Sequence, residues 1–88
     1  MLIKAKKDKI IKKYRTHEGD TGSPQVQIAL LTFEVEALTK HLKAHRKDVS
    51  SRRGLIKMVS DRRKLMKYLQ RENTAAYEAI VKELELKG

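Results

Sequence analysis

The sequence predicts an all-α fold of four helices, in which three helices form an antiparallel bundle and the N-terminal helix is mobile. Apolar residues recur at intervals of three and four along several segments, which is the period of an amphipathic helix. Alanine, leucine, lysine, glutamate and arginine dominate, and all are strong helix formers. Strand signals are nearly absent, because no Asn-Gly turn separates alternating segments. The 88 residues, with one proline and four glycines, fit a single domain over residues 1–88.

The first helix is expected over residues 2–14. Ile3, Ile10 and Tyr14 share one stripe of it, but lysines crowd the remaining surface. An isolated helix of this length is marginal in water, and like charges three or four residues apart weaken it further. We therefore expect this segment to be mobile unless an anionic partner docks on it.

A second helix is expected from Ser23 to about Ala44. Residues 19–22 form a turn cluster; Ser23 can then cap the helix, and Pro24 occupies the first helical position, where its missing N–H has no effect. The apolar stripe of this helix comprises Ile28, Leu31, Val35, Leu38 and Leu42. The stripe predicts that one face packs against the rest of the bundle.

A third helix is expected to start between Asp48 and Ser51 and to run to about Glu72. Its apolar residues are Leu55, Met58, Val59, Leu65, Met66 and Leu69. Arg62 falls within this face, where its stem can pack on the core while its guanidinium reaches outward.

Asn73 or Thr74 is expected to cap a last, short helix. Its apolar edge comprises Tyr77, Ile80, Val81 and Leu84. Long helices joined by short links imply that the bundle is antiparallel.

The chain carries a strong positive charge. Lys and Arg number 21 against 11 Asp and Glu, which gives a formal net charge of +10 at pH 7. This charge exceeds what solubility requires of a small domain and points to a polyanionic partner. Cysteine is absent, and no apolar run is long enough for a signal peptide or a membrane span. We therefore expect a soluble cytoplasmic protein without disulfides.

Four polar residues stand seven positions apart in the sequence: Gln27, Glu34, His41 and Asp48. Seven residues are nearly two helical turns, so the first three share one side of the second helix, and Asp48 continues their line into the link. The spacing alone favours the simpler interpretation, a solvated helix face.

The third helix carries a second candidate surface on the side away from its apolar face. This surface comprises Arg53, Lys57, Lys64, Tyr68 and Arg71, with Asp61 as its only acid. Arginine and lysine contact phosphates, and a tyrosine ring stacks on an unpaired base, so the surface suits RNA. A charged face that only keeps the protein soluble is the alternative, and the net charge favours RNA.

Asp48 is an acid in an otherwise basic stretch, and it has two possible roles. It can cap the third helix, where an acid also suits the helix dipole. A carboxylate beside RNA is also useful where it accepts a hydrogen bond from a base amino group. The wide minor groove of A-form RNA exposes the guanine amino group, so Asp48, Ser51 and a ring N–H of His41 form a candidate guanine reader. Both roles can coexist.

Other chemistries find little support in the sequence. His41, His45 and Asp48 have a spacing that could chelate a metal, but a fourth ligand and the acid of a zinc protease motif are missing. No serine or threonine has an obvious base and orienting acid, and there is no glycine-rich phosphate loop. We expect neither catalysis, nor a metal, nor a cofactor.

The stretches GDTGSPQVQIALLT, HLKAHRKD and SRRGLIKMVSDRRKLMKYLQR resemble the bacterial small-subunit ribosomal protein fifteen family. The resemblance covers essentially the whole chain and is most specific from Gly19 to Arg71. It implies a structural constituent of the small ribosomal subunit that binds the central domain of its RNA early in assembly, so that later proteins find their sites. It also implies contact with large-subunit RNA at an intersubunit bridge and, in some relatives, repression of their own messenger RNA.

The resemblance implies two RNA contacts. One is a three-way helical junction, met by positions matching Thr21, Gly22, Gln27, Tyr68 and Arg71. The other is a minor-groove element with a G·U wobble next to a G-C pair, read by positions matching His41, Asp48 and Ser51. The basic face of the third helix adds Arg53 and Lys64 as further RNA-binding residues.

The chain departs from the family pattern at Val49 and Ser50, where two histidines are common, and at Glu34, where some relatives carry a basic residue. Two other functions also stay open. One is a helical protein-interaction module that pairs through the second helix, although only about two heptads support it. The other is nonspecific packaging of nucleic acid by charge. The ribosomal function predicts a monomer when free.

Overall fold

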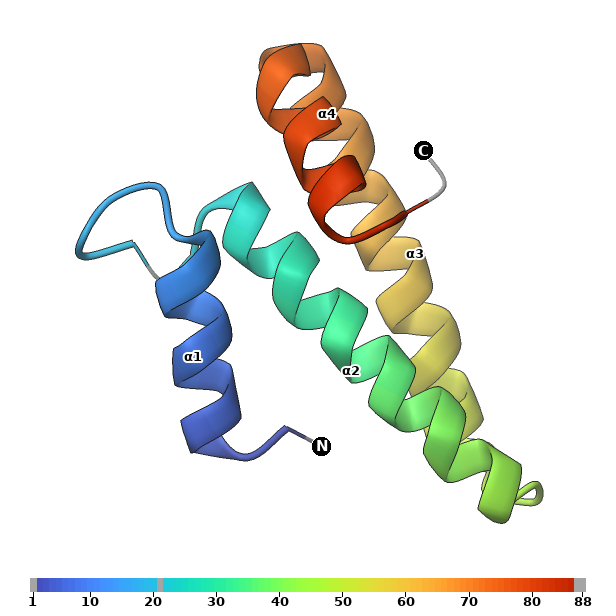
Figure 1. Ribbon diagram of the computed structural model, residues 1–88. Helices are drawn as coiled ribbons and strands as arrows, with labels where there is room; N and C mark the ends of the chain where they lie inside the picture. The colour runs from blue at the N-terminus through green and yellow to red at the C-terminus, as the bar shows by residue number, and fades with distance from the viewer. Residues whose placement is uncertain (1, 21, 87–88) are drawn as a thin grey trace.

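The computed structural model describes residues 2–20 and 22–86 and consists of helices joined by short links (Figure 1). They are α1 (Lys4–Tyr14), α2 (Pro24–Ala44), α3 (Val49–Glu72) and α4 (Thr74–Glu83). This part of the chain contains no strand, and none of its helices combines the length and apolar character that crossing a membrane requires. The all-α class and the predicted helix order are confirmed.

Side-chain hydrogen bonds fix the start of three helices. Ser23, Asp48 and Asn73 each accept from the backbone N–H three residues later, at 3.3, 3.0 and 3.1 Å. Each bond satisfies a backbone donor that has no partner within the helix, and these caps confirm the sequence prediction. By contrast, Ile3 offers α1 no side-chain cap, and α1 begins at Lys4 rather than at the predicted position two residues earlier.

α2 and α3 lie side by side and antiparallel along the length of the molecule, whose extents are 40 × 27 × 18 Å (Figure 1). α4 folds back along the end of α3, near the start of α2, while α1 lies on the other side of α2. The antiparallel packing of three helices is therefore as predicted. α1 packs against α2 in this structure, and its expected mobility stays a prediction.

Two apolar clusters hold the helices together. The first joins α2, α3 and α4 through the buried residues Ile28, Leu69, Tyr77 and Ile80. The second joins the N-terminal segment to α2 through the buried residues Leu2, Ile10 and Ala29. Tyr14 and Leu84 pack against both clusters, so the clusters are continuous. α2 is consequently covered from two sides and is the central helix of the fold.

The coverage of α2 explains why burial differs from the predicted stripe. Within the stripe, Ile28 and Leu38 are buried, whereas the other three residues are only partly buried: Leu31, Val35 and Leu42. Buried residues outside the stripe are Val26, Ala29 and Thr32. The Thr32 hydroxyl donates to the Ile28 carbonyl at 2.8 Å, which satisfies this buried polar group. Because neighbouring helices cover the stripe, it is a poor surface for pairing with another chain.

Candidate nucleic-acid interface

The line of polar residues on α2 is tied to its surroundings by intramolecular contacts. Gln27 Nε2 donates to a backbone carbonyl in the preceding turn at 2.6 Å, and the Glu34 carboxylate lies 3.9 Å from Lys7 Nζ of α1. His41 Nε2 lies 2.9 Å from Asp48 Oδ2. Each member of the line therefore has a partner, and the predicted continuation into the α2–α3 link is correct.

Asp48 organises the corner between α2 and α3. Its Oδ1 accepts from the Ser51 N–H at 3.0 Å, and its Oδ2 accepts from the Ser51 hydroxyl at 2.7 Å and contacts His41 Nε2. Hydrogen bonding from Ser51 in particular, with a smaller contribution from His41, holds the pKa of the Asp48 carboxyl well below its usual range. At neutral pH the group is an ionised acceptor, so Ser51 and His41 both donate to it. The capping role proposed from the sequence is confirmed.

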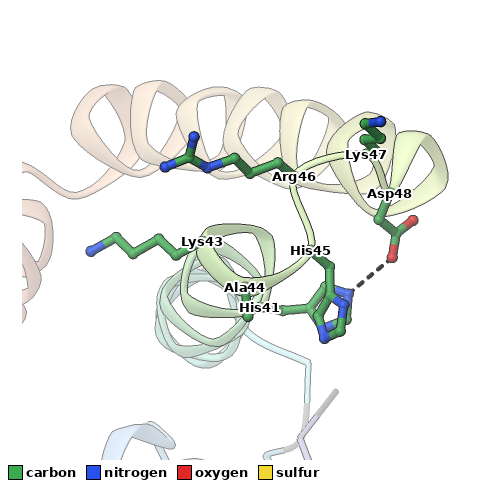
Figure 2. Close-up of a pocket in the computed structure, with 7 residues that line it drawn as sticks. All are labelled: His41, Lys43, Ala44, His45, Arg46, Lys47 and Asp48. Carbon is green, nitrogen blue, oxygen red and sulfur yellow. Dashed lines mark hydrogen bonds and ion pairs between the residues drawn. The ribbon is translucent and has the colours of Figure 1, made fainter.

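An open pocket of about 560 Å³ adjoins this corner and is lined by residues of the HLKAHRKD stretch (Figure 2). The rings of His41 and His45 stack in it, with their centroids 4.5 Å apart and their planes 28° apart. Figure 2 shows the Asp48 carboxylate turned toward these rings, while Lys43 and Arg46 extend away from them. The surface combines flat rings, a carboxylate and exposed cations, which are the groups that contact bases and phosphates.

The sequence missed the role of His45. The signal in the sequence is its spacing of four residues from His41, which puts the two rings on one face of the helix. The rings stack, and residues 2–20 and 22–86 hold no group of three side chains suited to a metal ion. His45 therefore belongs to the corner as a stacking partner of His41.

The turn before α2 is organised by Asp20, whose importance the sequence also did not reveal. The carboxylate is buried and accepts four hydrogen bonds, from the backbone and hydroxyl of Thr16 and from the backbone N–H groups of Gly22 and Ser23, at 2.8 to 3.0 Å. Hydrogen bonds from Ser23 and from the Thr16 backbone hold the pKa of Asp20 well below its usual range. Asp20 thereby fixes the path of the turn.

Gly22 is an exposed residue of this turn, and Gln27 binds its backbone carbonyl. Its carbonyl accepts the 2.6 Å hydrogen bond from Gln27 Nε2, and a Cβ added to it would meet no atom within 4 Å. The structure thus brings two predicted site residues together. Thr21, the third residue predicted for this turn, lies outside the described residues.

The α3 residues of the predicted site are exposed. Tyr68 is 47% exposed, and the Arg71 guanidinium lies 5.6 Å from the centre of its ring in a cation–π contact. Arg53 and Lys64 are also exposed and take part in no ion pair among the described residues. The site residues of α3 therefore form one pair near its end and two separate cations.

Most of the predicted residues lie toward one or the other end of the antiparallel α2–α3 pair. Leu69 and Ile28 share the first core cluster, so the end of α3 lies beside the start of α2. By their places along the helices, we call Gly22, Gln27, Tyr68 and Arg71 the turn cluster, and His41, Asp48 and Ser51 the corner cluster. Gln27 and His41 are 14 residues apart on α2, which corresponds to about 21 Å along a helix. Lys64 lies between the clusters in sequence along α3.

Comparisons with known proteins all point to one protein family. The model of the ribosomal protein S15 family matches residues 7–87. A small ribosomal subunit protein uS15 from Caldanaerobacter subterraneus subsp. tengcongensis is 54% identical over 87 residues, which cover 99% of both chains. The protein of the same name from Clostridium botulinum is 57% identical over 86 residues, covering 98% of this chain and 99% of the relative. That from Staphylococcus carnosus is 54% identical over 86 residues, covering 98% and 97%.

Proposed function

Because this chain belongs to the ribosomal protein S15 family, and so is a structural, non-enzymatic protein of the small ribosomal subunit, we propose that its two clusters bind ribosomal RNA at two points. The turn cluster meets a three-way helical junction of the central domain. The corner cluster reads the minor groove of an adjoining arm, at a G·U wobble next to a G-C pair. The observation that carries this proposal is the network of Asp48, Ser51 and His41, about 21 Å from the turn cluster.

The Asp48 carboxylate of the corner cluster has one acceptor site that no protein donor among the described residues uses, and a guanine amino group can bind there. A carboxylate offers about four acceptor sites, and three donors of the protein already use the Asp48 carboxylate. Oδ1 takes only the backbone bond of the cap, so one site on it is left for RNA. An ionised acceptor repels phosphates but binds an amino group strongly, which favours a base edge over the backbone.

The turn cluster suits close approach by an RNA backbone. The fold does not require glycine at position 22, because a Cβ there has free space and no glycine of the described chain has a positive φ. A residue without a side chain instead lets a phosphate or sugar come near the main chain. Tyr68, held beside Arg71, supplies a ring for stacking and a cation for phosphate at the same end of the molecule.

We further propose that the protein acts early in assembly, touches large-subunit RNA at an intersubunit bridge, is a cytoplasmic monomer when free and binds its own messenger RNA. Binding at two fixed points would select one geometry of the junction and so prepare the sites of later proteins. Val49 and Ser50, which replace the histidines common in the family, are both exposed at the corner. Their side chains cannot supply the charged contacts that histidines would.

The decisive experiment is nucleotide-resolution protection of small-subunit RNA by the purified protein. We expect two protected patches, one at the junction and one along a single arm, and we expect binding to weaken strongly when either is deleted. Duplex DNA at matched salt is the control for attraction by charge alone. Uniform protection, or equal affinity for the duplex, would show that the protein coats nucleic acid nonspecifically.

A further inference from the structure

We propose that a groove beside α3 and α4, next to the turn cluster, is a further RNA-binding site, and that it takes an unpaired nucleotide. The proposal rests on the proposed function, since that function supplies the RNA environment. The groove has a volume of about 370 Å³, within the range of ligand pockets. Its cations are Arg62, Arg63 and Lys67, and none of them forms an ion pair with an acid of the described chain.

The Arg62 side of the groove faces away from the Gln27–His41 line of α2. Arg62 Nη1 donates to Thr32 Oγ1 at 3.4 Å, which places this side of α3 next to the Thr32 side of α2. Thr32 and His41 are nine residues apart, and at about 100° per residue they point in nearly opposite directions from the helix axis. An RNA segment bound along the Gln27–His41 line therefore cannot also fill the groove.

Neighbouring residues of α3 belong to the candidate interface and to the groove. Lys64 and Tyr68 belong to the candidate interface, and the residue preceding each of them, Arg63 and Lys67, lines the groove. At about 100° per residue, Arg63 lies about 80° around α3 from Arg71 and Lys67 about 40° from it, so the cations of the groove border the candidate interface. This arrangement would place a bound nucleotide next to the RNA that the turn cluster holds.

The groove also has an apolar part, which favours an unpaired nucleotide over a duplex. Val59 and Met66 line it beside the cations, and Tyr77 of α4 and Gln70 complete it. A duplex offers a protein mainly phosphates and sugars, whereas an unpaired nucleotide also exposes a base face that apolar side chains can contact. The two phosphates that flank the nucleotide would lie at Arg63 and Lys67, and the base at Val59 and Met66. An acidic protein segment would satisfy the cations but would leave the apolar part unused.

The test uses the full chain saturated with a three-way junction RNA and a fluorescent oligouridylate of about ten nucleotides, followed by anisotropy over a range of salt. The double variant Arg63→Gln with Lys67→Gln should lower the slope of log affinity against log salt by about 1.4. Each lost phosphate contact on a single strand accounts for about 0.7 of this change. Junction affinity should change no more than in the matched control, Lys9→Gln with Lys12→Gln, which removes two exposed α1 charges outside the groove. Circular dichroism would verify that both variants fold.

Three outcomes would overturn the proposal. They are displacement of the oligouridylate by junction RNA, equal slopes for the two double variants, and stronger binding of an oligoglutamate of the same charge. Repeating the oligouridylate titration on free protein separates this result from the proposed function. If junction RNA itself shows no preference over duplex DNA, the proposed function fails, while the groove is still tested by the variants.

Discussion

Asp48→Asn should separate the structural role of Asp48 from its proposed role in reading RNA. Asparagine and aspartate cap helices about equally well, so the amide oxygen can keep the 3.0 Å bond to the Ser51 N–H. The amide nitrogen then takes the place of Oδ2. In the wild type, Oδ2 accepts from the Ser51 hydroxyl and faces His41 Nε2. Both of these partners must reverse from donor to acceptor. The cap survives, but the arrangement of donors and the negative charge at the corner are lost.

The magnitude follows from the one acceptor site that is left for a guanine amino group. In the variant this site belongs to a neutral oxygen, and a hydrogen bond to a charged acceptor is roughly twice as strong as one to a neutral acceptor. Discrimination between the G·U/G-C element and an A-U replacement should therefore fall roughly 5- to 20-fold. Affinity for the replaced RNA should stay or rise, because a charge that repels phosphates has been removed.

The assay is equilibrium binding of the two RNAs at several salt concentrations, together with thermal unfolding of the free protein. Asp48→Ala is the comparison that removes both roles, and it should lower the melting temperature as well as the discrimination. Ser51→Ala keeps the backbone donor of the cap but loses the hydroxyl bond to Oδ2, so it should reduce discrimination and lower the melting temperature less than Asp48→Ala does. The reasoning is refuted if Asp48→Asn weakens both RNAs equally, or if it unfolds at as low a temperature as Asp48→Ala.

Three further predictions concern the fold and its charges. Gly54→Ala should stabilise the protein by about 0.5 to 1 kcal/mol in urea unfolding, because its Cβ would lie in ordinary contact, 3.8 Å from Leu38 Cδ2, in a helix interior; an unchanged or lower stability contradicts this. Lys64→Gln should weaken binding to all RNAs alike and reduce the salt slope by about one, so a sequence-dependent loss would argue against a phosphate contact. The pKa of the Asp20 carboxyl is lower in the folded state than in the unfolded state. The stability that the ionised carboxylate contributes is therefore complete above about pH 4 and is lost as the pH falls further. Asp20→Asn should therefore unfold roughly 5 to 10 °C lower than the wild type at pH 7, with a difference that narrows toward pH 3, and a constant difference would rule out this linkage.

Local chemistry explains why the helix ends were predictable. Ser23 followed by proline, Asp48 and Asn73 each supply a side-chain acceptor three residues before the donor that it satisfies. These signals need no information from the rest of the fold, and all three helices begin where they indicate. α1, by contrast, has no side-chain cap, and its weakness stays a prediction from its length and its like charges.

Features set by the approach of separate helices were not predictable. Thr32 is buried because α2 is covered on two sides, and a stripe read from one helix cannot show a second cover. Asp20 looked like an ordinary turn residue, since its four hydrogen bonds depend on how the chain returns from α1 to α2. The same limit applies to the groove of Arg63 and Lys67. The sequence shows how the charges are distributed around α3, but it does not show that α4 forms one wall of the groove.

The clusters share a property that bears on how they would bind. Most of their polar groups are already held by the protein: Gln27 by the turn before α2, and His41 and Ser51 by Asp48. Groups held in this way lose little conformational freedom when a partner binds, so more of each contact contributes to affinity. The separation of the two clusters is fixed by α2, which is held in place because α1 covers one of its sides and α3 with α4 covers the other. An RNA whose arms placed the two contacts at a different distance could satisfy only one cluster, and this geometric requirement, more than the charge of +10, would make binding selective.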